Sequence, residues 1–239
     1  MMELITLTVV VFCLSIVQSL FGVGLLVFGT PTLLMFGYSF EETISYLLPC
    51  SCVVSLMQTL TGSQYIATPK YVFPLYCLPT VVIGLSVVLI YDTGFDIANL
   101  VGFAMIATAI IRLSKQLRRP LEGTLKKFKR TFIAIIGLIH GLTNMGGGLL
   151  TILMSSTLEK KESITFNIAY GYLLMGVTQI ITLFIVSDVS LGWTHLGLAS
   201  LAGFTYGLIG RFMIKIPSQA TFNKLITTLT LGYGIVLLL

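Results

Sequence analysis

The chain has 239 residues, of which 56% are hydrophobic and 10% charged, and its mean hydropathy of +0.99 lies well beyond that of soluble domains. The net charge of +5 does not indicate nucleic-acid binding, because eight of the fourteen Lys and Arg residues lie in one short segment, Arg112 to Arg130. Such a segment is typical of a cytoplasmic loop that obeys the positive-inside rule. Long charge-free runs elsewhere predict an all-α polytopic membrane protein.

Residues 4–40 form the first predicted element, a run of 37 positions without a charged side chain. As one helix it would extend about 55 Å at 1.5 Å per residue, nearly twice the thickness of a hydrocarbon core. Gly22 and Gly24 lie near its centre, where glycine permits a sharp change of backbone direction. We expect a broken helix here, which counts either as one net crossing or as a hairpin that leaves on the side it entered.

Three membrane spans follow the first broken helix. Charged residues delimit them at about 43–66, 71–91 and 96–113. Residues 1–113 are therefore predicted to form a first transmembrane repeat. Residues 114–130, which are basic and contain a proline and a glycine, are predicted to form a cytoplasmic linker.

Residues 131–158 repeat the first arrangement, with a tighter break at Gly146-Gly147-Gly148. The sequence of 142–150 matches that of 18–26 after a shift of 124 positions. The second transmembrane repeat is predicted to cover residues 131–239. Its three spans are expected at about 163–186, 191–212 and 218–238.

The basic residues distinguish a crossing from a hairpin. If both broken helices cross once, Lys160, Lys161, Arg211, Lys215 and Lys224 lie opposite nine other basic residues. If both are re-entrant hairpins, all fourteen lie on the cytoplasmic side, and the positive-inside rule favours this arrangement. The outside then holds only acidic residues: Glu3, Glu41, Glu42, Asp92, Asp96 and Asp188. Each half has three crossings, so the fold class becomes two inverted repeats, each a re-entrant hairpin plus three transmembrane helices.

The two breaks also predict a binding site. The returning half-helices would start near Leu25 and Leu149, and their N-terminal N–H groups would face the membrane centre from opposite sides. Two converging helix N-termini can bind an anion without a buried Lys or Arg. The candidate substrate-binding residues are Ser19, Gly22, Gly24, Leu25, Gln58, Thr143, Asn144, Gly146, Gly147, Gly148 and Gln179. For their polar side chains, hydrogen bonding between helices is the alternative interpretation.

His140 lies four residues before Asn144, on the same predicted helix face. A histidine titrates near neutral pH, so His140 is a candidate for coupling transport to protons. A hydrogen-bonded structural histidine is the alternative. No metal-binding cluster is expected, and the four cysteines are interpreted as small core residues.

The order and spacing of several glycine motifs resemble the TauE/SafE sulfite exporter family. The first two are Gly22-Val23-Gly24 with Pro31, and Met145-Gly146-Gly147-Gly148. The third comprises Trp193, Gly203, Gly207, Gly210 and Pro217. The resemblance covers nearly the whole chain. It implies a permease for sulfite, sulfoacetate or related sulfur-containing anions, with the glycine-rich breaks bordering the substrate site.

The expected function is secondary transport of a small anion, most consistent with sulfite or another sulfur-containing oxyanion or organosulfonate, by alternating access. No phosphate-binding loop of the Walker type is present, and no cofactor is expected. The expected partners are the anion and membrane lipid, without nucleic acid; a homodimer is left open. The expected location is the inner (cell) membrane of a bacterium or archaeon. The alternatives are a membrane-embedded subunit of a larger complex and an intramembrane enzyme, although no His-Glu-x-x-His or Gly-x-Ser-x-Gly motif occurs.

Overall fold

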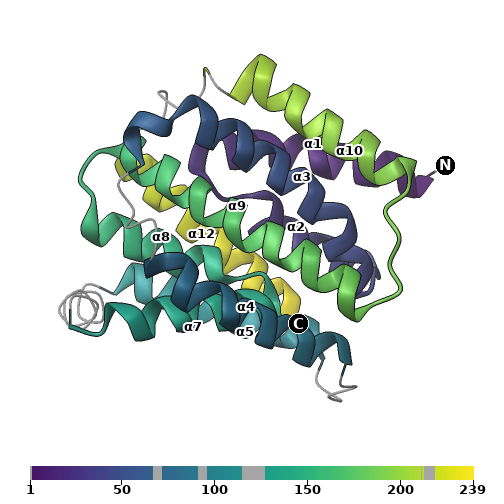
Figure 1. Ribbon diagram of the computed structural model, residues 1–239, viewed down its shortest axis with the longest axis horizontal. Coiled ribbons are helices and arrows are strands. Elements are labelled where there is room, and N and C mark those ends of the chain that lie inside the picture. Colours follow the sequence, from purple (N-terminus) through teal and green to yellow (C-terminus); the bar gives the residue numbers. More distant parts are fainter. Residues whose placement is uncertain (1, 67–71, 91–95, 115–126, 211, 213–218) are drawn as a thin grey trace.

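The computed structural model describes residues 2–66, 72–90, 96–114, 127–210, 212 and 219–239 (Figure 1). Within these ranges the chain forms ten α-helices, one 3-10 turn and one π-helical segment, without a strand. This confirms the all-helical fold class. Most of the predicted linker 114–130, and the predicted external residue Asp92, lie outside the described residues.

The helices of the first half end and begin close to the predicted boundaries. They are α1 (Met2–Phe21), α2 (Leu25–Met35), α3 (Phe40–Thr61), the 3-10 turn η1 (Ser63–Tyr65), α4 (Val72–Ile90) and α5 (Ile97–Leu113). Helix α3 begins with a capping box, in which Glu42 N–H donates to Ser39 Oγ and Ser39 N–H donates to Glu42 Oε2. Asp96 caps α5 by accepting from Ala98 N–H at 2.9 Å.

The second half also begins with a helix, a short helix after the break and then a long helix, and it has a π-helical segment in place of the 3-10 turn, one helix later. Its elements are α7 (Lys129–Thr143), α8 (Gly146–Thr157), α9 (Lys161–Val186), α10 (Trp193–Thr205), the π-helical η2 (Tyr206–Gly210) and α12 (Gln219–Leu238). The sequence predicted neither the π-helical segment nor the early start of α8, which begins at Gly146 rather than near Leu149.

Four helices are long and apolar enough to cross a membrane: α1, α3, α4 and α9. Helix α1 was expected to be only one arm of a hairpin. Its 20 residues give it a length of about 30 Å, so it can cross the hydrocarbon core by itself. Its returning arm, α2, has 11 residues and is about half as long.

The contacts of α1 and α2 show that the chain turns back at the first break. Gly29 on α2 packs against the Leu14 side chain on α1, at a site where an added Cβ would lie 3.3 Å from it. A cavity beyond the end of α2 is lined by Met2, Glu3 and Thr6 together with residues 36–38. Burial and then the negative charge of Glu3 raise the pKa of Tyr38. The end of α2 therefore lies beside the start of α1, as a hairpin requires.

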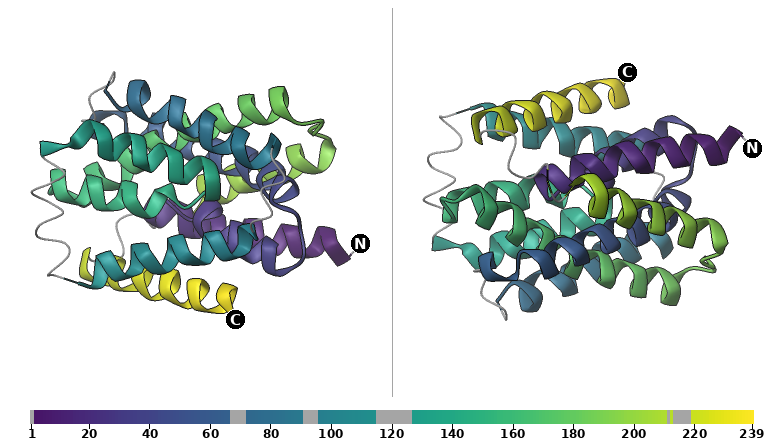
Figure 2. Two further views of the ribbon diagram at one scale, coloured as in Figure 1. Left: turned by 90° about the horizontal axis from the view of Figure 1, so that it is seen from below. Right: turned by 90° about the horizontal axis from the view of Figure 1, so that it is seen from above.

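The second break has the same form. Asn144 adopts the left-handed conformation at φ 61° and ends α7, and α8 then begins at Gly146. Gly146 packs against His140 and the carbonyl group of Ile136, one and two turns back on α7. Helix α8 consequently runs back beside α7 (Figure 2).

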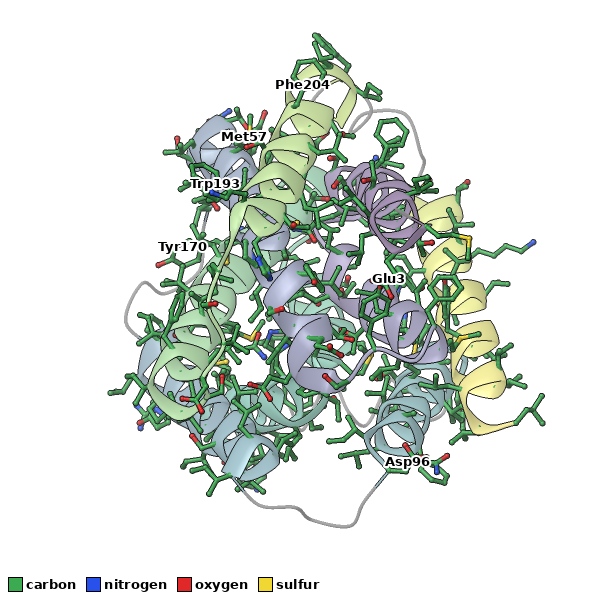
Figure 3. The ribbon with its side chains drawn as sticks, turned by 90° about the vertical axis from the view of Figure 1, so that its right-hand side faces the viewer. Glu3, Met57, Asp96, Tyr170, Trp193 and Phe204 are labelled. Atoms are coloured by element: carbon green, nitrogen blue, oxygen red, sulfur yellow. The ribbon has the colours of Figure 1, made fainter. Side chains whose placement is uncertain are left out.

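Charged side chains gather at the two ends of the bundle. Glu3 and Asp96 start α1 and α5, and Asp188 follows α9, at the end that holds the N-terminus (Figures 1 and 3). The described basic residues lie at the opposite end, where α5 finishes and α7 and α9 begin: Arg112, Lys127, Lys129, Arg130, Lys160, Lys161 and, near the start of α12, Lys224. Many large apolar side chains between the two ends are exposed, as expected for surfaces that face lipid.

Candidate functional site

Gln18, on the last turn of α1, organises the first break. Its Oε1 accepts from the N–H of Leu25, the first residue of α2, at 3.1 Å. Its Nε2 donates to Ser51 Oγ and Ser55 Oγ on α3, each at 3.1 Å. The glycine at position 22 has φ +73°, which permits the turn between the helices. One buried amide therefore caps α2 and ties the break to α3.

Gln58 on α3 completes the first break. Its Nε2 donates to the carbonyl oxygen of Ser19 at 3.1 Å, in the last turn of α1. It also donates at 3.3 Å to the carbonyl oxygen of Gln18, which already accepts from the N–H of Gly22 at 2.7 Å. Its Oε1 is buried and has no hydrogen-bond partner among the described residues.

Gln179 on α9 binds the end of α7 at the second break, as Gln58 binds the end of α1 at the first. Its Nε2 donates to Asn144 Oδ1 at 2.7 Å and to the carbonyl oxygen of His140, in the last turn of α7, at 3.4 Å. Its Oε1 is also buried and unpartnered within the described ranges. Gln58 and Gln179 thus occupy matching places: each is on the first long helix after a break, and each caps the helix before that break.

One face of α9 brings the two breaks together. At the first break, an added Cβ on Gly22 would lie 2.7 Å from the carbonyl oxygen of Thr165 and 3.2 Å from Ile168 Cβ. At the second, Gly147 packs directly against the hydroxyl group of Tyr172. Ile168 and Tyr172 are one turn apart on the same side of α9, a separation of about 6 Å. Both breaks therefore contact the same face of α9, the first at its backbone and the second at the end of the Tyr172 side chain.

A direct hydrogen bond also joins the second break to the first hairpin. Asn144 Nδ2 donates to Thr30 Oγ1, on the second turn of α2, at 3.1 Å. Both side chains are fully buried. The amide group of Asn144 consequently links α2 with Gln179 on α9.

The remaining polar side chains at the breaks bond within their own helices. Ser19 Oγ donates to the carbonyl oxygen of Ser15 at 2.6 Å and packs against Gly210 in η2. Thr143 Oγ1 donates to the carbonyl oxygen of Ile139 and accepts from the N–H of Met145. These two hydroxyl groups cap and stabilise the helix ends.

His140 and Tyr172 differ from these groups. Their side chains are 0% and 1% exposed, and their rings meet edge to face with centroids 5.5 Å apart. Neither ring nitrogen of His140, nor the hydroxyl group of Tyr172, has a hydrogen-bond partner among the described residues. The backbone of Asn144 and the side chain of Gln179 are polar groups that act on the His140 imidazole without meeting the geometry of a hydrogen bond. A cluster of unsatisfied buried polar atoms therefore borders the second break.

Sequence reasoning missed Gln18, Thr30 and Tyr172 as members of this centre. The sequence did contain a signal for Gln18, because this amide lies in an apolar run only four residues before Gly22. Thr30 and Tyr172 lie in apolar helices far from their partners in the chain, so no local pattern marks them.

The centre holds polar groups but no buried ionised side chain: within the described ranges, no Lys, Arg, Asp or Glu is buried. No group of three or more His, Cys, Asp or Glu residues that could hold a metal occurs in the same ranges. Broken helices that meet in a buried polar centre, within a bundle containing membrane-spanning helices, define an integral multi-pass membrane protein.

The chain belongs to the TauE/SafE sulfite exporter family. The sequence model of that family, described as "Sulfite exporter TauE/SafE", matches residues 7–237. This confirms the resemblance carried by the glycine motifs and makes the protein a member of a transporter family, in agreement with a non-enzymatic role. Comparisons with curated proteins and with solved structures found no match.

Proposed function

We propose that the protein is a secondary transporter that moves a small anion, sulfite or another sulfur-containing oxyanion or organosulfonate, across the inner (cell) membrane of a bacterium or archaeon. The family assignment supports the class of substrate. Alternating access of two halves around a central site would carry the anion across.

The observation that carries the proposed site is the contact of both breaks with one face of α9, at Ile168 and Tyr172. The N-termini of α2 and α8 lie at these breaks, and each presents N–H groups with the positive end of a helix dipole. Two such N-termini can bind an anion where no Lys or Arg is buried among the described residues. The proposed substrate-binding residues remain those of the two breaks, with Gln58, Asn144 and Gln179.

Two inverted repeats, residues 1–113 and 131–239 joined by the basic linker 114–130, are part of this proposal. Support comes from the matching roles of Gln58 and Gln179, each of which donates to carbonyl groups at the end of the helix before its break. Further support comes from the acidic and basic ends of the bundle, which agree with an odd number of crossings in each half.

Transport measured in reconstituted vesicles tests the proposal. Purified protein in liposomes should increase the flux of at least one of sulfite, thiosulfate and sulfoacetate over that of empty liposomes. Folded protein that moves none of the three would contradict the proposed function. Purification only as an obligate complex with other proteins would instead favour a subunit without a transport path of its own.

A further inference from the structure

Two buried tyrosines differ in whether their hydroxyl groups form a hydrogen bond. Tyr206 and Tyr172 are each 1% exposed. The hydroxyl group of Tyr206 lies 2.7 Å from Thr61 Oγ1, whereas that of Tyr172 has no hydrogen-bond partner within the described ranges. A buried tyrosine hydroxyl group normally has a partner, because leaving it without one lowers the stability of the fold. The hydroxyl group of Tyr172 is therefore free to form a hydrogen bond with a ligand.

His140 has the same property and lies in contact with Tyr172. The two rings meet edge to face at 5.5 Å, and both nitrogens of the fully buried imidazole are unpartnered in the described part of the chain. The nearest residues of α8 complete the group: Gly147 contacts the hydroxyl of Tyr172, and Gly146 packs against Cβ of His140. Both unsatisfied side chains thus border the first turn of α8, where the N–H of Gly148 donates to the carbonyl oxygen of Met145 but those of Gly146 and Gly147 lack intrahelical partners.

We propose that the hydroxyl group of Tyr172 and the imidazole of His140 bind the transported anion directly, at the N-terminus of α8. This inference rests on the proposed function and names donors that it did not assign. The hydroxyl and one imidazole N–H donate to oxygen atoms of the anion, and the N–H groups of α8 supply the remaining donors. The ligand is a small oxyanion with at least two acceptor oxygens, recognised by neutral donors alone.

The close contact between Gly147 and the Tyr172 hydroxyl group also implies that Tyr172 must move when the anion binds. A Cβ added to Gly147 would overlap the Tyr172 hydroxyl group, so not even a methyl group fits between them in this conformation. The phenol must swing away from Gly147 to admit an oxyanion to the α8 N-terminus. Its hydroxyl then donates to the anion instead of covering the glycine.

The test is anion binding to the full-length protein, purified in detergent and titrated with sulfite, thiosulfate or sulfoacetate in a calorimeter. Tyr172→Phe removes one oxygen and keeps the ring contact with His140. We expect its affinity for the anion to fall about tenfold or more, as for the loss of a hydrogen bond to a charged group. The unliganded variant should melt at the same temperature as the wild type or higher, because an unsatisfied buried group has been removed.

Tyr170→Phe is the matched control. Tyr170 lies two residues away on the same helix, on the other side of α9, and is only partly buried (Figure 3). This variant should bind the anion as the wild type does. A purely structural role for Tyr172 predicts the opposite pattern, with a lower melting temperature and unchanged affinity.

Variants of His140 separate direct binding from proton coupling. His140→Asn retains a hydrogen-bond donor but cannot carry a proton at neutral pH, and His140→Phe retains only bulk. Direct binding predicts a clearly lower affinity in His140→Phe than in His140→Asn. Equal affinity in both variants and in the wild type, with flux lost in both, would overturn the assignment of His140 in favour of a proton carrier.

The possible failures are distinguishable. Wild-type protein that binds none of the three anions would contradict the proposed function and this inference together. Wild-type binding with unchanged affinity in Tyr172→Phe would overturn this inference alone and leave the proposed function in place.

Discussion

Asn144 donates a hydrogen bond to Thr30 at 3.1 Å, and this contact joins the end of α7 to the second turn of α2, 114 residues earlier in the chain. The same Asn144 side chain accepts from Gln179 at 2.7 Å and has the left-handed backbone conformation that ends its helix. A single residue therefore sets the second break and fixes its position against the first hairpin. Movement of one hairpin relative to the other must break this contact.

Thr30→Val should weaken the link between the hairpins without changing side-chain volume. The variant leaves the Nδ2 group of Asn144 unpaired, so the free energy of unfolding should fall by about 1 kcal/mol. A double-mutant cycle with Asn144→Ala, measured by thermal unfolding in detergent, should show that the two effects are not additive. Thr8→Val, at an exposed position where the hydroxyl bonds only within α1, is the control. Additive effects of Thr30→Val and Asn144→Ala would mean that the contact does not couple the hairpins.

Gln58→Leu and Gln179→Leu should destabilise the protein to a similar degree. Gln58→Leu leaves the carbonyl oxygen of Ser19 without its side-chain donor, and Gln179→Leu leaves Asn144 Oδ1 without its donor, so each should lower the free energy of unfolding by about 1–3 kcal/mol. Thermal unfolding measures both, and Gln64→Leu, at an exposed position in η1, should have little effect. A large loss for one glutamine and none for the other would argue against matching roles.

Glycine clusters and charge-free lengths were sufficient to predict the broken helices, because both are local properties of the chain. The run 4–40 is too long for one span, and Gly22, with φ +73°, lies where it turns. The start of α8 was missed by three residues. Asn144 ends α7 through its own left-handed backbone conformation, and the three glycines that follow are helical from Gly146 onward. At the second break, the glycine cluster therefore indicated the region of the turn, whereas the residue that makes the turn is Asn144.

The partners across the site could not be predicted in the same way. The contact of Tyr172 with Gly147, and that of Thr30 with Asn144, depend on how α9 and α2 pack against the second break. Both residues sit in apolar helices whose hydrophobic pattern is nearly uniform around the axis, so periodicity does not indicate which face turns inward. Gln58 and Gln179 were predictable because an amide in an apolar span is itself unusual.

Labelling of single cysteines from each side of the membrane tests the inverted arrangement. In a variant without the four native cysteines, a cysteine at Phe36 should react from outside and one at Lys160 from the cytoplasm, because both positions are exposed at opposite ends of the bundle. Phe36 is preferable to Ser39, whose side chain caps α3. Reaction of both cysteines from the same side would contradict the inverted repeats.

A bulky residue at either break should stop transport and leave membrane insertion intact. Gly147→Leu would force a side chain into the hydroxyl group of Tyr172, and Gly24→Leu would meet the backbone of Gln18. Gly232→Leu is the control, because nothing lies within 4 Å of an added Cβ at Gly232, on the exposed side of α12. Insertion is measured by membrane extraction and by elution as a single species in gel filtration.

The most direct test of the transport site is the flux of radiolabelled sulfite into proteoliposomes containing wild-type protein, Gly147→Leu or Gly232→Leu, at equal amounts of inserted protein. We expect sulfite flux for the wild type and for Gly232→Leu, and flux no greater than that of empty liposomes for Gly147→Leu. Wild-type flux in Gly147→Leu would show that the anion does not pass the second break and would contradict the proposed site.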